Sequence, residues 1–222
     1  MPRRSYDQFC AVARALDVVG ERWTLLIVRE LLAGPRRYTD LHADLPGVST
    51  DVLASRLKEM ERDGLVEHRR LPRPAGAGVY DLTPRGRGLL PALTALAQWE
   101  SAVLEERRPT DALRAHWFAL PLLEIIAGHS AHARGVVEIS LDEGIFHLRV
   151  GDADEAGYAD GPAEAPDARI ATDLATVTAL ASGQLDFGQA VADKRADVSG
   201  AGDLAHTLRT ATPDDNSAPA RP

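Results

Sequence analysis

One segment, from residue 49 to residue 62, alternates polar and apolar side chains with the period of a helix. Asp51, Ser55, Lys58 and Arg62 fall on one face of this helix, and apolar residues fall on the opposite face. Carboxylate, hydroxyl and amine groups in this arrangement can form hydrogen bonds with base edges in the major groove of DNA. The spacing therefore indicates a helix that can contact DNA, although the solvated face of a helical bundle shows the same pattern.

The beginning of the same helix adds groups that suit phosphate. Ser49 stands where an N-cap belongs, and Ser49 and Thr50 lie where helix N-termini bind phosphate oxygens. Arg56 lies off the apolar stripe and could contact either a phosphate or a base. Asp51 could accept a hydrogen bond from the cytosine amino group or cap the helix. We expect Glu59 and Glu61 to pair with neighbouring arginines rather than to meet DNA.

A cluster of arginines follows this helix. The segment 68–87 contains five arginines against one acidic residue, Asp81. Arginine suits phosphate and narrow minor-groove contacts because its guanidinium group stays charged and presents a fork of donors. The complete set of candidate DNA contacts is Arg37, Thr39, Ser49, Thr50, Asp51, Ser55, Arg56, Lys58, Arg62, Arg69, Arg70 and Arg73.

Other chemistries have less support in the sequence. Cys10 is the only cysteine, which excludes an intrachain disulfide and a metal site with several cysteines. His129 and His132 stand three residues apart, but no acidic residue completes a known metal-binding spacing, so we expect no metal. The chain has no nucleophile elbow, phosphate loop or zincin motif. We therefore expect neither an enzyme nor a cofactor.

The candidate contacts must be positioned by short elements in the first half of the chain. Apolar periodicity predicts the helices, and glycine and proline mark their ends. Two strands around a Pro/Gly loop predict a hairpin. The order of four helices, hairpin and helix is that of a winged helix-turn-helix, in which one helix enters the major groove and the hairpin is the wing. The expected elements are helices at 7–19 and 22–33, a short helix from Thr39, a helix at 49–62, strands at 65–71 and 79–82, and a long helix at 83–108.

Four motifs occupy this half in a fixed order. They are the runs 10–31, 34–41, 57–66 and 80–86, the last of which reads Tyr-Asp-Leu-Thr-Pro-Arg-Gly. Together they resemble the HxlR-type transcriptional regulators, and the resemblance covers residues 7–106. It implies a homodimer that is joined through its first and last helices and binds a pseudo-palindromic operator in double-stranded DNA.

The resemblance also bears on Cys10, which stands where some HxlR-type regulators carry a redox- or electrophile-sensing cysteine. The family commonly has proline after this cysteine, whereas this chain has Ala11. A sensing thiol needs exposure and a lowered pKa, whereas free cysteines are among the most buried residues. Of the two interpretations, we favour a small buried residue.

The charge distribution predicts two domains. The chain has 222 residues and a net charge of -8, which argues against a nucleic-acid-binding protein. Residues 1–108, however, carry 17 Lys and Arg against 15 Asp and Glu, and residues 109–222 carry 8 against 18. We expect a DNA-binding and dimerisation domain at 1–108 and a separate domain at 109–212. Without a membrane-spanning apolar run or a signal core, we expect a cytoplasmic protein that does not contact the membrane.

The second half reads as a mixture of strands and helices, which makes the whole chain α+β. We expect a helix within 109–135 that ends at Gly128, strands at 136–141, 145–150, 168–172 and 196–200, helices at 174–181, 186–192 and 203–210, and a disordered tail at 213–222. Three features resemble the sterol carrier protein type 2 fold: the hairpin followed by an acidic Asp-Gly-Pro loop at 160–162, the run 170–177 with the following Gly-Gln-Leu, and the run 196–200 before the last helix. The resemblance covers residues 112–212 and implies an α/β layer with an apolar cavity for a lipid-like ligand.

Large apolar side chains could line such a cavity or equally fill an ordinary core. The candidates are Trp117, Phe118, Phe146, Tyr158, Leu174, Leu180 and Phe187. The sequence thus predicts a homodimeric transcriptional repressor whose operator binding is modulated by a small apolar ligand in the second domain. Two alternatives stay open: a regulator that senses redox changes through Cys10, and a lipid-binding module whose winged helix binds proteins.

Overall fold

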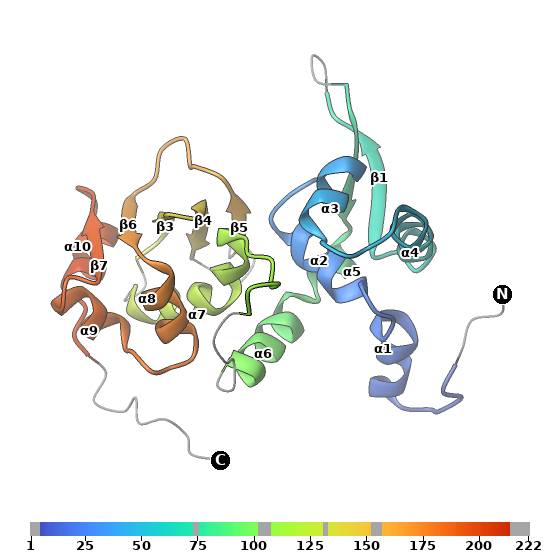
Figure 1. The fold of residues 1–222 in the computed structure, drawn as a ribbon, viewed down its shortest axis with the longest axis horizontal. Helices are drawn as coiled ribbons and strands as arrows, with labels where there is room; N and C mark the ends of the chain where they lie inside the picture. The colour runs from blue at the N-terminus through green and yellow to red at the C-terminus, as the bar shows by residue number, and fades with distance from the viewer. Residues whose placement is uncertain (1–4, 73–75, 102–107, 131–132, 152–156, 214–222) are drawn as a thin grey trace. The chain divides into compact units, whose positions relative to one another are not determined.

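The computed structural model describes residues 5–72, 76–101, 108–130, 133–151 and 157–213, and its fold is mixed α+β (Figure 1). The chain divides into two compact units, residues 1–93 and residues 94–222. No helix among the described residues is long and apolar enough to cross a membrane. The predicted domain boundary after residue 108 and the predicted tail at 213–222 are not tested, because residues 102–107 and 214–222 lie outside the described part.

The first unit is a winged helix, as the sequence predicts. Its helices and strands follow one another in the expected order, and the two strands pair antiparallel, with Val66 opposite Leu82 and Arg70 opposite Gly78. The elements are α1 (Ala11–Val19), α2 (Thr24–Leu32), α3 (Tyr38–Asp44), α4 (Thr50–Arg62), β1 (Val66–Arg70), β2 (Gly78–Leu82) and α5 (Pro84–Arg87), followed by α6 (Leu90–Ser101), which begins in this unit.

The single long helix expected at 83–108 is wrong, because two helices, α5 and α6, occupy this stretch. Gly88 follows α5 and weakens any continuation of the helix. Pro91 is the second residue of α6, where its missing N–H does no harm, whereas in a helix continuing from α5 it could not donate to the Arg87 carbonyl four residues earlier. The chain therefore restarts its helix at Leu90.

The apolar face of α4 anchors this helix to the core. Leu53, Leu57 and Met60 are buried, as the periodicity predicts, and they join buried residues of α2 and α3 such as Ile27 and Leu41. Full burial of such a side chain stabilises the fold by about 1.5–3 kcal/mol. The core thus fixes which face of α4 remains in solvent.

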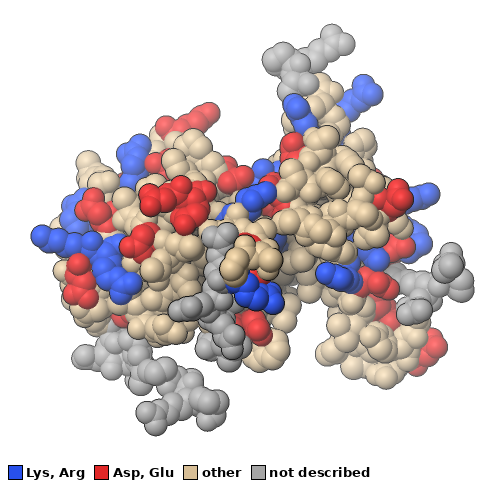
Figure 2. Space-filling view, in the orientation of Figure 1, with Lys and Arg blue, Asp and Glu red and all other residues tan. Residues whose placement is uncertain are grey.

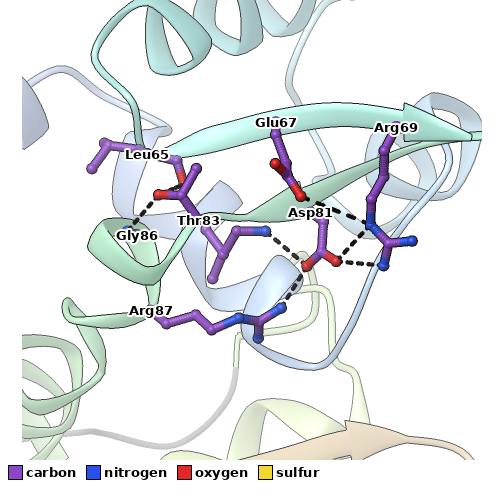
Figure 3. A network of polar contacts seen from close by, with 8 residues as sticks. Leu65, Glu67, Arg69, Asp81, Thr83, Gly86 and Arg87 are labelled. Atoms are coloured by element: carbon purple, nitrogen blue, oxygen red, sulfur yellow. Dashed lines mark hydrogen bonds and ion pairs between the residues drawn. The ribbon is translucent and has the colours of Figure 1, made fainter.

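The junction between β2 and α5 explains the Leu-Thr-Pro-Arg-Gly part of the fourth motif. The Thr83 hydroxyl donates to the Gly64 carbonyl at 2.6 Å, so it ties α5 to the end of α4. It also accepts from the Gly86 N–H at 3.2 Å and so caps α5 (Figure 3). A Cβ atom on Gly86 would lie 2.2 Å from the Leu65 carbonyl oxygen. Glycine is therefore required at this position by close backbone approach.

The second unit is an α/β layer built on one five-stranded sheet of order β5-β4-β3-β6-β7. β3 pairs parallel with β6, and the other neighbours pair antiparallel. Its elements are a 3-10 helix η1 (Ala115–Phe118), α7 (Ala119–His129), β3 (Gly135–Leu141), β4 (Gly144–Val150), β5 (Gly157–Asp160), β6 (Ala168–Thr172), α8 (Leu174–Ala181), α9 (Phe187–Ala192), β7 (Ala196–Ser199) and α10 (Asp203–Arg209).

One face of this sheet forms the core of the unit. A buried row of apolar side chains crosses four strands at matching register positions: Phe146, Ile139, Ile170 and Val198. Residues of the opposite parity, such as Glu138, are at least partly exposed. The helices therefore cover one side of the sheet, and the strands show the apolar and polar alternation of a sheet with one solvated face.

Two details of the second half differ from the expectation. The helix expected within 109–135 is a 3-10 turn followed by α7, which ends at His129. A turn at 108–111 precedes the 3-10 turn, and in it the Asp111 side chain accepts a hydrogen bond from the Arg108 N–H. β5 was not expected, because it lies in an acidic stretch rich in glycine, alanine and proline. Within the described part of the chain, its four residues pair with β4 alone, at the edge of the sheet, where such short strands are tolerated.

Candidate nucleic-acid interface

The solvent face of α4 carries most of the candidate base contacts. Thr50, Asp51, Ser55 and Lys58 are exposed on this helix, as is Arg62 in its last turn. Because the opposite face is buried, these side chains are held in one row on a rigid helix. The arrangement supplies amine, guanidinium, hydroxyl and carboxylate groups that can read base edges or bind phosphate.

The N-terminus of α4 is capped by Ser49, as the sequence predicts. The Ser49 hydroxyl oxygen accepts a hydrogen bond from the Val52 N–H at 3.3 Å. Tyr38, from α3, donates through its hydroxyl to the Thr50 carbonyl at 2.7 Å. The first turn of α4 is thus fastened to α3, the preceding helix of the helix-turn-helix.

Arg56 differs from the other candidates on α4. Its side chain is 17% exposed and lies in an ion pair with Glu59 at 2.6 Å and in a longer one with Glu21 at 3.5 Å. The expected pairing of Glu59 with an arginine is confirmed. Arg56 therefore links α4 to the segment between α1 and α2, and a contact with DNA would require it to leave these carboxylates.

The candidates around α3 are exposed. Arg37 stands at the N-cap position of α3, and Thr39 lies in its first turn, where its hydroxyl donates to Asp40 at 3.2 Å. Next to them, the backbone of Arg36 forms an antiparallel bridge with Tyr80 of β2, with hydrogen bonds of 3.0 Å and 2.8 Å. This bridge fixes the wing to the loop before α3.

The wing carries its arginines on different faces. Arg70 is exposed near the end of β1, and Arg69 is 39% exposed and turned toward Asp81 of β2. Arg73 lies outside the described residues. Burial, with Glu61 and Tyr38 nearby, raises the pKa of Tyr80 on β2, so this side chain stays neutral over the physiological range.

Asp81 joins three elements at the base of the wing (Figure 3). Its side chain is 8% exposed and accepts hydrogen bonds from Arg69 of β1 and Arg87 of α5, each with a shortest distance of 2.6 Å. The backbone N–H of Leu82 also donates to it, at 2.8 Å. From the sequence, Asp81 is only the one acid among five arginines, and Arg87, although one of those five, is not among the candidate DNA contacts. Pairing across the hairpin, in which Asp81 lies diagonally from Arg69, was the signal that could have revealed the network.

The basic side chains of the first unit gather where these elements reach the surface. Figure 2 shows Lys and Arg on both sides of the wing and along the edge of the unit that bears α4. Asp and Glu side chains lie among them on the same edge, so attraction to the phosphate backbone would come from individual arginines and lysines and not from a uniformly positive face.

Cys10 is exposed, which contradicts the buried position that we favoured. It occupies the N-cap position of α1, and the backbone N–H groups of Ala13 and Val12 lower the pKa of its thiol. The apolar stripe of α1 faces solvent, so the helix does not bury the residue before it.

The candidate ligand-binding residues fall into two groups in the second unit. Phe146, Tyr158, Leu180 and Phe187 are buried, with at most 4% of each exposed. The other three, Trp117, Phe118 and Leu174, are partly exposed. Two histidines lie beside carboxylates in this unit: His116 Nδ1 is 3.4 Å from Asp160 Oδ1, and His129 Nε2 is 3.6 Å from Asp186 Oδ2. Among the described residues, no three His, Cys, Asp or Glu side chains form a metal-binding group.

Comparison with known proteins places the winged helix in a family. A sequence model of the HxlR-like helix-turn-helix matches residues 18–108. YvaP of Bacillus subtilis, an uncharacterized HTH-type transcriptional regulator, is 38% identical over 86 residues, which cover 39% of this chain and 80% of YvaP. The chain belongs to the HxlR-like helix-turn-helix family.

This HxlR-type chain has further relatives that are transcriptional regulators. The HTH-type transcriptional regulator YodB of B. subtilis is 33% identical over 91 residues, which cover 41% of this chain and 81% of YodB. The reduced form of YodB aligns at 30% identity with a TM-score of 0.39, covering 46% of this chain and 100% of that one. The redox regulator HypR in its oxidized form aligns at 26% identity with a TM-score of 0.40, covering 44% and 100%.

The family membership makes this protein a transcriptional regulator of the HxlR type. The match ends at residue 108 and leaves out most of the second unit. The resemblance of residues 112–212 to sterol carrier protein type 2 stays a prediction, as do the individual roles of the candidate residues.

Proposed function

We propose that this HxlR-type regulator binds double-stranded operator DNA through the exposed face of α4 and the wing formed by β1 and β2. The observation that carries the proposal is the polar row on α4, which is held outward by a buried apolar face and lies in the same unit as an arginine-bearing hairpin. α4 supplies base contacts in the major groove, and the wing supplies phosphate or minor-groove contacts.

Selection of binding sites from a random duplex pool, followed by titration at several salt concentrations, tests this proposal. We expect an enriched pseudo-palindromic sequence and an affinity that falls steeply with salt. Lys58→Ala should reduce the discrimination between the selected site and random duplex, whereas Lys194→Ala, a matched change at an exposed position of the second unit, should not. Absent or salt-independent binding would contradict DNA recognition and favour a protein-binding winged helix.

We further propose that the regulator acts as a homodimer joined through α1 and α6. Both helices expose large apolar side chains: Val12 is 67% and Leu16 43% exposed on α1, and Leu96 is 46% and Trp99 75% exposed on α6. Such surfaces on a water-exposed helix mark protein contacts. Two copies related by a twofold axis would present two α4 helices to two half-sites.

Analytical ultracentrifugation tests the dimer. Val12→Glu places a charge in the apolar stripe and should shift the protein to monomer. Arg14→Glu places the same side chain on the opposite face of α1 and should leave the dimer intact. A monomeric wild type, or equal effects of both changes, would contradict this interface.

The second unit is proposed to take a small apolar, lipid-like ligand that relieves repression. Support comes from its α/β layer and from the apolar side chains around Phe146, Tyr158 and Phe187. A ligand there would have to bind the DNA-bound and DNA-free arrangements with different affinity. Titration with a fluorescent fatty acid, alone and with the selected duplex, tests this role. A probe that does not bind, or that binds without changing DNA affinity, would exclude fatty-acid-type ligands as the signal.

A second candidate for the signal is oxidation or electrophile addition at Cys10. The observation that favours it is the exposed thiol with a lowered pKa at the beginning of α1, the helix proposed for dimerisation. Treatment with diamide should then lower the DNA affinity of the wild type and leave Cys10→Ser unchanged. An equal response of both proteins, or none in either, would leave the second unit as the place of signal entry.

A further inference from the structure

The carboxylate of Asp81 is shared by two arginines that come from different elements. Arg69 of β1 donates to Oδ2 through its Nε, at 3.0 Å, and through one terminal nitrogen, at 2.6 Å. Arg87 of α5 donates to Oδ1 through one terminal nitrogen at 2.6 Å. Figure 3 shows the two guanidinium groups reaching the carboxylate from two sides. A buried carboxylate thus holds both groups in fixed orientations.

Each guanidinium group keeps donors for another acceptor. The side chains of Arg69 and Arg87 are 39% and 48% exposed, and within the described residues the second terminal nitrogen of each makes no hydrogen bond. Donors of this kind, charged and already oriented, bind phosphate oxygens strongly because little side-chain freedom is lost on binding.

We propose that Asp81 organises Arg69 and Arg87 into a phosphate clamp at the base of the wing, with each arginine binding one of two neighbouring phosphates of the DNA backbone. The inference rests on the proposed DNA binding and extends it from the wing to α5. Asp81 is a positioning residue in this clamp, since it touches the arginines and not the DNA. Phosphate contacts of this type set the orientation of the protein on the duplex and carry no sequence preference.

Glu67 allows a test of the clamp, because removing its charge and removing that of Asp81 should change DNA affinity in opposite directions. Its Oε1 atom lies 4.0 Å from Arg69 Nε, and its side chain is 57% exposed. Asp81 and Glu67 together balance the charge of the two arginines, so a simple sum of charges predicts that removing either acid strengthens DNA binding. The clamp predicts opposite effects, because Asp81 orients the arginines whereas Glu67 only competes with the phosphate.

The experiment uses the full chain and a labelled mixed-sequence duplex, titrated by fluorescence anisotropy at several salt concentrations. Arg69→Gln and Arg87→Gln should each reduce the slope of log K against log salt by about 0.9, which corresponds to one lost phosphate contact. Arg149→Gln, a matched change at an exposed position of β4, should leave the slope unchanged. Unchanged slopes for both clamp variants would overturn the proposal.

Substitution of the two carboxylates distinguishes the orienting of the arginines by Asp81 from a simple loss of negative charge. Asp81→Asn should bind about tenfold more weakly than wild type, the size of one lost charge-assisted hydrogen bond, although the protein becomes less acidic. Glu67→Gln should bind more tightly. Thermal unfolding by circular dichroism checks that each variant is folded at the temperature of the titration. Tighter binding by a folded Asp81→Asn protein would overturn the positioning role.

Arg87→Lys tests the clamp even where Asp81→Asn does not fold. This variant preserves the positive charge on α5 but loses the planar guanidinium group with its several donors. We therefore expect the wild-type salt slope with a lower affinity. Wild-type affinity in this variant would overturn the oriented clamp. The clamp and the DNA-binding function fail in different ways: a wild type without salt-dependent binding contradicts both, whereas a wild type that binds DNA while the arginine variants keep its slope contradicts the clamp alone.

Discussion

At the scale of single residues, the junction between β2 and α5 depends on two small side chains. Thr83 caps α5 and binds the carbonyl groups at the end of α4, and Gly86 lets the Leu65 carbonyl approach its Cα. Thr83 follows Asp81 by two residues, and Gly86 directly precedes Arg87, so the placement of Arg87 depends on a backbone contact that tolerates no side chain. These contacts explain why the Tyr-Asp-Leu-Thr-Pro-Arg-Gly motif contains threonine and glycine at these two positions.

Gly86→Ala should therefore destabilise the first unit. The new Cβ atom would lie 2.2 Å from the Leu65 carbonyl oxygen, and the backbone must shift to remove this overlap. We expect a loss of about 1–3 kcal/mol in the free energy of unfolding. Gly128→Ala in α7, where a Cβ atom meets nothing within 4 Å, is the control and should be neutral or slightly stabilising. Denaturant unfolding followed by circular dichroism measures both, and an equally stable Gly86→Ala protein would contradict the close approach.

Cys10 makes a prediction about pH. The backbone N–H groups of Ala13 and Val12 stabilise the thiolate and lower the pKa of the thiol. A lower pKa means that the reactive thiolate is populated at lower pH, so alkylation by iodoacetamide should reach half its maximal rate at a lower pH than for glutathione. Cys10→Ser measures the background labelling. A midpoint at or above that of glutathione would show that α1 does not activate the thiol.

At the scale of elements, the N-cap of α8 makes the stability of the second unit depend on pH. Asp173 caps α8 and accepts from the Thr176 N–H at 2.6 Å, and this hydrogen bond is the main cause that lowers the pKa of Asp173, with Arg195 adding to it. Because the pKa is lower in the folded state, the stabilisation is present above the unfolded-state pKa and is lost as pH falls through the folded-state value.

Asp173→Ala should cost about 1 kcal/mol of unfolding free energy at neutral pH, as expected for a lost N-cap. The difference between this variant and wild type should shrink in acid. Asp173→Asn keeps a capping oxygen but cannot titrate, so it should be nearly as stable as wild type at neutral pH. Denaturant titrations at several pH values test this, and a pH-independent difference for Asp173→Ala would argue against the carboxylate as the source.

Elements were predictable where one periodic signal decided them. The apolar stripe of Leu53, Leu57 and Met60 identified α4 and its buried face, and the alternation in β3 and β4 identified the hairpin of the second unit. β5 was missed because its four residues gain their strand conformation from pairing with β4 and not from their own composition.

The candidate site was predictable to a similar extent. The exposed row on α4 follows directly from helical spacing, whereas the state of Arg56, Arg69 and Arg87 depends on which carboxylate each one reaches. Arg56 meets Glu21, which lies 35 residues away, and Arg69 meets Asp81 across the hairpin. Such partners are set by the tertiary fold, and no local pattern contains them.

At the scale of the whole molecule, the two parts of the chain carry net charges of opposite sign. Residues 1–108 carry 17 basic against 15 acidic residues, and residues 109–222 carry 8 against 18. An acidic second part should repel the duplex, and the basic residues that attract it lie in the winged helix. The net charge of -8 is therefore a poor guide to what the first unit binds.

A fragment of residues 1–108 should bind mixed-sequence DNA at least as tightly as the full chain, because it lacks the acidic second part. The comparison uses anisotropy titrations at one salt concentration, with sedimentation to show that the fragment still dimerises. Weaker binding by a dimeric fragment would mean that the second part contributes to DNA affinity and does not oppose it.

The order of strands in the second unit has a consequence for how the chain is made. β3 lies in the middle of the sheet and pairs with β6, and β7 closes the other edge with Val198 in the buried row. During synthesis this sheet stays incomplete until β7 and α10 have left the ribosome, and until then β6 is an open edge. The winged helix needs only residues that are made earlier. The proposed DNA-binding surface can therefore form before the second unit can fold. A chain whose synthesis stops between these two points would carry that surface together with an incomplete sheet.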